Sequence, residues 1–297
     1  MSIDIFDRDL LSAKRCRFAG SAEDYDFLLK RVAEDIADRL SAVTRKFSHA
    51  LEVGAHHGVV GRLLMQGQII DELTSMEECP ALLNKCAGTK IQGDPENLPF
   101  ESGAFDLVIS ALSLHFVNDL PGALLQIRRV LRPDGLFIGV MPGGRTLFEL
   151  RESFAVAEEE IEGGVSPRVA PFVDVRDGGA LLQRTGFALP VSDLDVVQVS
   201  YETPFHLMRE LQRMGGSNIL RSRSRKPLRR STMMRMVEVY QQRFEGADGR
   251  IPATFELLNL AGWSPHESQQ KPLQPGTAKT RLADALGVEE FPTGEKP

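Results

Sequence analysis

Residues 51–64, LEVGAHHGVVGRLL, place an apolar strand and a helical run on either side of a short turn bounded by glycines. Gly54 and Gly58 let the backbone bend sharply and approach a ligand closely. The first turn of the following helix directs backbone N–H groups and the positive end of its dipole into the same turn. The segment therefore predicts a strand–turn–helix unit, which either binds a nucleotide-like ligand or is an ordinary connection without one.

The alternation of strand and helix patterns continues as far as residue 141. Apolar strands are predicted at 48–54, 69–76, 89–94, 105–114 and 136–141, and helices at 59–65, 79–86 and 119–131. Such alternation is typical of an α/β fold with a Rossmann-like, doubly wound, mostly parallel sheet. Continuous apolar strands favour a sheet that is covered on both faces. Ligands of such sheets bind outside the carboxyl ends of the strands.

The flanking regions are expected to add helices and strands to this sheet. Four segments are predicted: an N-terminal arm and helix over 1–45, a Rossmann-like domain over 46–205, a C-terminal addition facing substrate or partner over 206–270, and a flexible tail over 271–297. Within the arm, residues 1–20 look exposed, and residues 24–45 form an amphipathic helix. The additions after residue 144 comprise helices near 146–162, 177–187, 206–218 and 232–244, and strands within 188–201 and 254–263.

The charge balance limits the classes of partner. The 297 residues carry a net charge of −6, and the isoelectric point is near 5.6, which argues against a general electrostatic grip on nucleic acid. No run approaches the about 18 apolar residues that a membrane span needs. Acidic residues at positions 4, 7 and 9 are unlike a signal peptide. The sequence therefore predicts a cytoplasmic protein.

The three cysteines, Cys16, Cys79 and Cys86, form no C-x-x-C pair, and their odd number favours a reducing compartment over a disulfide framework. Cys79 and Cys86, seven residues apart, are interpreted as packing residues, because free cysteines are usually buried and inert.

A basic cluster, RSRSRKPLRR, occupies residues 221–230. Such a cluster could receive an acidic partner, a phosphate or a membrane surface, so peripheral membrane association stays open. The alternative is an ordinary solvated face.

Polar residues follow several of the predicted strands. A nucleotide-binding sheet commonly places an acid after its second strand to hold ribose hydroxyls, and Glu77 and Glu78 are the candidates. Asp94 follows the third strand, where its carboxylate could accept an adenine amino group. These residues equally suit a helix cap and a polar connection.

His115 follows the fourth strand and is the first catalytic candidate, since histidine exchanges protons near neutral pH. A purely structural hydrogen bond is its alternative role. Trp263 and His266, in AGWSPHES, are further catalytic candidates or the docking point of the C-terminus. No histidine spacing forms a local metal motif, so no metal is predicted.

Several motifs together carry a family resemblance. VGAHHG, GDPENLPF, FDLVISALSLHFVNDLP and LRPDGLFIG resemble, in order and spacing, the motifs of class I S-adenosylmethionine-dependent methyltransferases, and SLHFVNDLP is also similar to malonyl-carrier-protein methyltransferases. IFDRDLLSAKR, GGRTLFELRESF, ELQRMGGSN and PATFELLNLAGWSPHESQQKP resemble the family of the mitochondrial respiratory complex I assembly factor numbered five. This second resemblance runs along nearly the whole chain. It implies hydroxylation of an arginine on a complex I subunit, and binding of S-adenosyl-L-methionine.

Carried over by position, the resemblance implies cofactor contacts from eight residues: Glu52, Gly54, His56, Gly58, Glu77, Asp94, Glu96 and Leu112. Two positions depart from the family pattern. His56 replaces the middle glycine of the loop, and the ribose acid falls on Met76, which leaves Glu77 one residue late. Because a one-residue shift reverses side-chain direction in a strand, either the pocket is re-formed around Glu77 or the cofactor is weakly bound or absent.

Three functions follow as hypotheses. The first is an enzyme that modifies a protein arginine of a complex I subunit during assembly. The second is a carrier-protein or small-molecule O-methyltransferase, and the third is a non-catalytic assembly chaperone with a degenerate cofactor site. The C-terminal HESQ segment and the basic cluster favour the first or the third.

Overall fold

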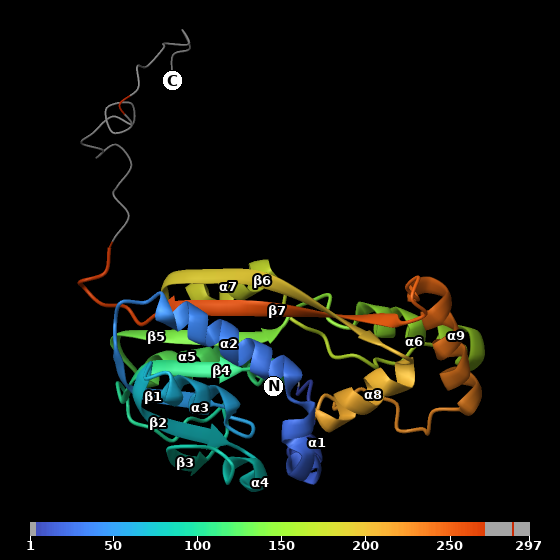
Figure 1. Cartoon of the computed structure of the whole chain (residues 1–297), viewed down its shortest axis with the longest axis horizontal. Coiled ribbons are helices and arrows are strands. Elements are labelled where there is room, and N and C mark those ends of the chain that lie inside the picture. Colours follow the sequence, from blue (N-terminus) through green and yellow to red (C-terminus); the bar gives the residue numbers. More distant parts are fainter. Residues whose placement is uncertain (1–3, 271–286, 288–297) are drawn as a thin grey trace. The chain divides into compact units, whose positions relative to one another are not determined.

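A seven-stranded sheet organises the chain (Figure 1). The structure, a computed structural model, describes residues 4–270 and residue 287. Residues 1–265 form one compact unit, and residues 266–297 form a second. The predicted tail, 271–297, lies outside the described residues apart from position 287. In the described part of the chain, no helix has the length and apolar character required to cross a membrane.

The strand order is β3-β2-β1-β4-β5-β7-β6. The strands are β1 (Phe47–Val53), β2 (Ile70–Glu77), β3 (Thr89–Gln92), β4 (Phe105–Ala111), β5 (Leu131–Pro142), β6 (Ala188–Tyr201) and β7 (Ile251–Trp263). Strands β1 to β5 pair in parallel, and β7 is antiparallel to both of its neighbours. The doubly wound α/β fold is thus confirmed. Strand β5 begins at Leu131, five residues before the strand predicted over 136–141.

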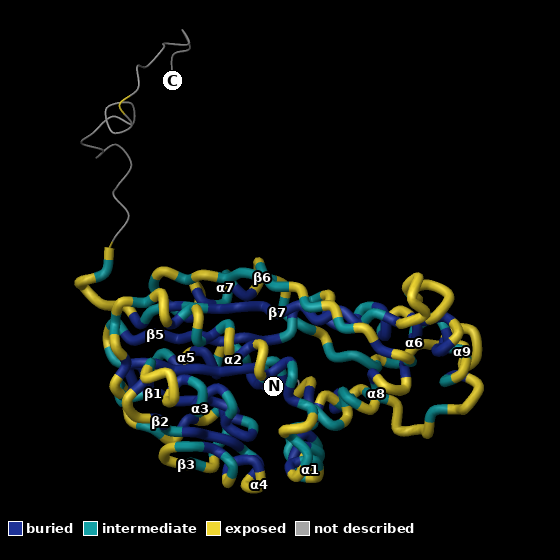
Figure 2. The backbone as a smooth tube through the Cα atoms, in the orientation of Figure 1, coloured by how far each residue is buried: buried dark blue, intermediate teal, exposed yellow. Residues whose placement is uncertain are grey.

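Helices cover both faces of the sheet, which explains the continuous apolar strands in the middle of it (Figure 2). In β4, Leu107, Ile109 and Ala111 point into one core cluster and Val108 points into the other, as the pleat requires. The helices α2 (Phe27–Ser41) and α3 (Val59–Gln66) pack on one face, and α5 (Leu120–Val130) and α7 (Val175–Arg184) pack on the other. The amphipathic helix predicted over 24–45 corresponds to α2.

The N-terminal arm is a folded part of the molecule. It forms α1 (Arg8–Phe18), which begins where the Asp7 carboxylate accepts a hydrogen bond from Leu10 N at 3.2 Å. Phe6 and Leu11 are buried in a cluster with Phe116 and the 219–220 segment. The expectation of an exposed arm is therefore wrong, because the apolar side chains of this short segment find a partner far away in the sequence. A 3-10 helix, Ala19–Tyr25, joins α1 to α2.

Helices also flank the antiparallel end of the sheet. They are α6 (Phe148–Glu162), α8 (Pro204–Arg213) and α9 (Arg230–Phe244), while the short α4 (Pro80–Leu83) follows β2. The register pairs Leu257, in the middle of β7, with Pro142 at the carboxyl end of β5, and Trp263, the last residue of β7, with Leu136 in the middle of β5. The carboxyl end of β7 therefore points away from the carboxyl end of β5.

Candidate functional site

The turn after β1 has the backbone conformation that its glycines predict. Gly54 and Gly58 have φ angles of 69° and 77°, in the left-handed region that favours glycine. A Cβ atom at Gly54 would lie 1.9 Å from Ser113 Oγ, and one at Gly58 would lie 2.7 Å from Cys86 Cα. Both glycines are thus required by close packing against other segments of the chain. The amides of Gly54 and Ala55 donate to the carbonyl oxygen of Met76, at 2.9 and 3.0 Å.

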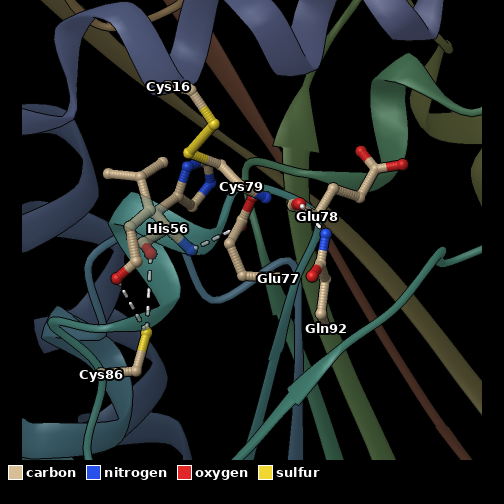
Figure 3. Close-up of a disulfide and its surroundings, with 8 residues drawn as sticks. Cys16, His56, Glu77, Glu78, Cys79, Cys86 and Gln92 are labelled. Atoms are coloured by element: carbon tan, nitrogen blue, oxygen red, sulfur yellow. Dashed lines mark hydrogen bonds between the residues drawn. A yellow bond between two sulfur atoms is a disulfide. The ribbon is translucent and has the colours of Figure 1, made fainter.

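The acid at the end of β2 holds this turn in place (Figure 3). The buried Glu77 carboxylate accepts hydrogen bonds from His56 N at 3.0 Å and from Cys79 N at 3.2 Å. Met76, which occupies the position of the family's ribose acid, is fully buried in the core. The structure therefore places a carboxylate beside the turn, and its described contacts are to backbone amides.

The acids after β3 are bound by an arginine from the N-terminal helix. Arg8 Nη1 lies 2.6 Å from Asp94 and 2.9 Å from Glu96, and Nη2 lies 2.5 Å from Glu78. The Arg8 side chain is only 13% exposed, whereas that of Asp94 is 47% exposed. One guanidinium therefore joins α1 to the connections that follow β2 and β3. We name this arrangement the Arg8 clamp.

The clamp gives a first prediction, for the variant Arg8→Gln. Removing the guanidinium leaves three neighbouring carboxylates without their shared cation, and we expect a loss of about 1–2 kcal/mol in the free energy of unfolding. Urea denaturation at low salt measures this loss. The matched control is Arg31→Gln, whose ion pair with Asp195 is about half exposed on both sides and should contribute much less. Equal losses in the two variants would contradict a special role for the clamp.

Glu52 of β1 is not directed at the turn. Its side chain is buried, and Oε2 would lie 2.7 Å from a Cβ atom at Gly61, so it packs against α3. The pKa of this carboxyl is raised to about 8, mainly by burial. The nearby Glu77 charge also raises the pKa, while a backbone hydrogen bond at Gly61 lowers it. Glu52 is therefore largely protonated at neutral pH. Glu52 thus lies where it can support the turn from within the core.

A cavity of about 190 Å³ opens at the carboxyl ends of β1, β4 and β5. His56, Leu112 and His115 line it from the sheet, and Pro142, Thr146 and Leu147 line it from the region after β5. Its remaining walls include Arg15 and Phe18 of α1, part of α2, and residues 168–172 and 211–219. The structure thus brings three predicted site residues together, at the place where sheets of this type bind ligands.

Three non-glycine residues on the cavity wall have left-handed backbone conformations. The φ angles are 51° for His56, 49° for Leu112 and 55° for Leu147. Such conformations cost free energy and persist only where the surrounding structure holds them. At His56, two hydrogen bonds supply this support: the amide donates to Glu77, and Nε2 lies 3.0 Å from the carbonyl oxygen of Ala111. Burial lowers the pKa of His56 to about 3, so the ring is neutral.

His115 is the strongest candidate for chemistry in this cavity. Its ring lies against Phe116, with 3.9 Å between the ring centroids, and 6.0 Å from the ring of Phe172. Its buried Nδ1 has no hydrogen-bond partner among the described residues. Burial lowers the pKa of His115 well below its ordinary value, and the positive charge of Arg15 adds to this effect. His115 is therefore neutral near pH 7, and it can accept a hydrogen bond or, as a weak base, a proton.

Sequence reasoning did not single out Arg15, which lines the same cavity and is 7% exposed. The sequence spacing could have indicated its inward direction. Arg15 follows the buried Leu11 by four residues and so shares its helix face. Lys14 and Arg17 surround it in the sequence, so the one inward-facing cation could not be distinguished by charge alone.

Trp263 does not line this cavity. It pairs with Leu136 and Ala188, and Leu136 in turn pairs with Leu107 in the amino-terminal half of β4. His266 belongs to the second unit, where its Nδ1 contacts Ser268 Oγ at 2.7 Å. Trp263 therefore does not join His115 in one described site. Among the described residues, no group of three or more His, Cys, Asp or Glu side chains could hold a metal ion.

The cysteine interpretation needs a correction. Cys16 and Cys79 form a disulfide between α1 and the residue that precedes α4, while Cys86 is free and buried (Figure 3). The packing role is thus correct only for Cys86. Cys16 and Cys79 lie 63 residues apart, and only the docking of α1 against α4 brings them together. Burial raises the pKa of the Cys86 thiol to about 12, which makes it a poor nucleophile.

The basic cluster is partly neutralised within the fold. Arg221 pairs with Asp4, Arg223 pairs with Asp7, and Arg229 pairs with Glu162. Part of the cluster therefore anchors the segment between α8 and α9 to the N-terminal arm and to α6. These intramolecular ion pairs leave fewer positive charges of the cluster available to bind a membrane or an acidic partner.

Comparison with known proteins agrees with this fold. A family model described as a methyltransferase domain matches residues 51–139. The YcgJ protein from Bacillus subtilis superposes with a TM-score of 0.53, covering 77% of this chain and 97% of that one, at 13% identity. A phosphoethanolamine N-methyltransferase 2 of Haemonchus contortus, solved with S-adenosyl-L-methionine, gives 0.51 at 15% identity, covering 84% of this chain and 57% of that one. At these identities the likeness shows the fold alone.

The sequence relatives are much closer. The chain is 41% identical to the mitochondrial arginine-hydroxylase NDUFAF5 of Danio rerio over 95% of this chain and 89% of that one, and 40% identical to the Homo sapiens protein over 99% and 87%. It is 31% identical to a malonyl-[acyl-carrier protein] O-methyltransferase of Halorhodospira halophila, over 93% and 95%. The chain therefore belongs to the family of methyltransferase-fold proteins that includes the arginine-hydroxylase NDUFAF5.

Proposed function

We propose that this chain is an enzyme that modifies an arginine side chain of a respiratory complex I subunit during assembly, with S-adenosyl-L-methionine as its cofactor. The relatives at 40–41% identity are named arginine-hydroxylases, and they match nearly the whole chain. The assignment of a complex I subunit as the substrate rests on the resemblance of the sequence motifs to the family of complex I assembly factors.

The observation that carries this proposal is the environment of His115. A neutral imidazole with a free, buried Nδ1 accepts a hydrogen bond from a guanidinium N–H, and it can remove a proton from a reacting group. The aromatic ring of Phe172 lines the same cavity, as do the rings of Phe18 and Tyr25, over which the Arg213 guanidinium of this chain lies at 5.1 and 5.8 Å. Phe172 is therefore the ring without a described cation. Aromatic faces attract a guanidinium cation through their quadrupole. The cavity thus offers both contacts that an arginine side chain needs.

The residues at the carboxyl ends of the strands also fit the cofactor. Asp94 is half exposed even within the Arg8 clamp, so its carboxylate can accept an additional donor on the adenosine side. Glu77 lies beside the glycine turn, and the cavity with Leu112 and His115 adjoins it. When bound, S-adenosyl-L-methionine supplies a methyl group on an electrophilic sulfonium.

Carrier-protein or small-molecule methylation is the second candidate, because the O-methyltransferase relatives also match nearly the whole chain. In that reaction the chain's own task is to place the acceptor oxygen in line with the methyl group. The cavity has the same location for either substrate.

Mass spectrometry of complex I subunits separates these functions. Peptides are compared between a strain that lacks this chain, the same strain complemented with it, and one complemented with His115→Ala. Gain of one oxygen atom on an arginine, in the wild-type complement only, is the expected result; this hydroxylation consumes dioxygen and two electrons from a donor in the cell, because S-adenosyl-L-methionine supplies neither. Identical arginine masses in all strains would overturn the proposal. In that case, methylation of malonyl-carrier protein in vitro supports the second candidate, and reduced complex I assembly without modification supports a chaperone.

A further inference from the structure

Arg15 has an unusual position for a cation. It is 7% exposed, lines the cavity, and forms no ion pair with any described carboxylate. Its Nε is buried and has no hydrogen-bond partner in the described part of the chain. Its one described favourable contact is with the ring of Phe116, whose centroid lies 5.7 Å from Arg15 Cζ. The cavity lining includes one carboxylate, that of Asp26, and its oxygens are bound by Lys30 at 2.8 Å and His57 at 3.0 Å. The Arg15 guanidinium, with five N–H donors, thus has no described carboxylate of its own.

Burial of a charge without a counter-charge destabilises a protein by several kcal/mol, and removal of such a charge is often stabilising. The fold nevertheless holds Arg15 firmly in this position. The Arg8 clamp fixes the beginning of α1, and the disulfide at Cys16, the next residue after Arg15, fixes its end. A cation that is unpaired and held by two anchors is typical of a preorganised binding group.

The chemistry of the guanidinium selects the ligand. Its planar donor fork matches a carboxylate, which it binds through two parallel hydrogen bonds. Arg15 shares the cavity with Leu112 and His56, which adjoin the glycine turn. A ligand that extends from this turn into the cavity therefore presents its far end to Arg15.

We propose that Arg15 binds the carboxylate at the amino-acid end of the adenosyl cofactor. This inference rests on the proposed function in one respect, because it requires a cofactor with an adenosine end and an amino-acid end. It assigns a binding role to a residue of the N-terminal helix, outside the strand-end motifs. The role is positional, since Arg15 orients the ligand beneath α1.

Calorimetry with two non-reacting probes tests the proposal without any turnover. S-adenosylhomocysteine carries the carboxylate, and 5′-methylthioadenosine lacks the amino-acid end. We expect Arg15→Gln to weaken S-adenosylhomocysteine binding by about 10- to 100-fold, the range for a hydrogen bond to a charged group, and to leave methylthioadenosine binding unchanged. Arg15→Lys should fall in between, because it keeps the charge and loses the fork. Arg17→Gln, an exposed change on the same helix, is the matched control.

Thermal melting separates a binding role from a structural one. If Arg15 serves the ligand, the ligand-free Arg15→Gln variant should melt at or above the wild-type temperature, and only the shift produced by S-adenosylhomocysteine should shrink. Three results would overturn the inference. Arg15→Gln could weaken the binding of both probes equally, the ligand-free variant could melt below the wild-type temperature, or the wild type could fail to bind S-adenosylhomocysteine. The peptide masses described above decide the proposed function separately, since they report arginine modification and not cofactor contacts.

Discussion

His115→Ala is expected to lower the rate of arginine modification by about 10²- to 10⁴-fold, the contribution typical of a positioned acid or base. The imidazole lies in the cavity with its buried Nδ1 free of protein partners. Alanine removes this group and leaves the aromatic wall in place. Because His115 makes no described hydrogen bond through Nδ1, the melting temperature should change little. Quantitative mass spectrometry of the product peptide measures the rate.

The pH dependence gives an independent check. The pKa of His115 is lowered well below 6.5, mainly by burial, so the ring stays neutral when the pH falls through the range in which an ordinary histidine gains a proton. Modification should therefore continue at pH 6 at nearly the rate seen at pH 8, as far as this group is concerned. An exposed, unperturbed imidazole base would lose most of its activity over that interval.

His206→Ala is the matched control, because His206 is an exposed histidine at the start of α8 and does not line the cavity. Its rate should equal that of the wild type. A His115→Ala variant that modifies the peptide at the wild-type rate would remove His115 from the reaction. A large loss of stability would instead identify a structural role.

The disulfide is expected to have the largest effect on stability. Cys16→Ser should lower the free energy of unfolding by about 2–4 kcal/mol, since a cross-link over 63 residues restricts the unfolded chain strongly. Reduction of the wild type should produce the same loss. The variant should also bind S-adenosylhomocysteine more weakly, because α1 carries Arg15 and Arg8. Urea denaturation with and without a thiol reductant measures the effect.

Two comparisons make this prediction specific. Cys86→Ser removes the free buried thiol and should leave stability within about 1 kcal/mol of the wild type. Cys16→Ser should gain no further sensitivity to the reductant, since its disulfide is already absent. Unfolding curves for Cys16→Ser that superpose on those of the oxidised wild type would show that this bond does not stabilise the fold.

Local patterns predicted most of the central sheet. Continuous apolar runs such as those of β1 and β4 report burial on both faces, and they need no knowledge of distant residues. The last strand, β7, was also expected from its apolar run, but its place in the sheet follows from pairing with β5, more than a hundred residues away, and with β6, at least 50 residues away. The same difficulty explains why an arm with many charges was expected to be exposed. Leu11 is buried by a segment more than 200 residues away in the sequence.

For the candidate site, the sequence by itself determined the positions that follow each strand, because parallel strands bring their carboxyl ends to one edge of the sheet. His56, Leu112 and His115, three of the candidates, line one cavity there, and their roles stay predictions. Which charges meet in that region depends on how distant segments pack. Sequence patterns record distances along the chain, whereas ion pairs and disulfides depend on distances in space. The docking of α1 thus sets Arg8 on the acids expected to face adenosine, joins Cys16 to Cys79, and turns Arg15 toward the cavity.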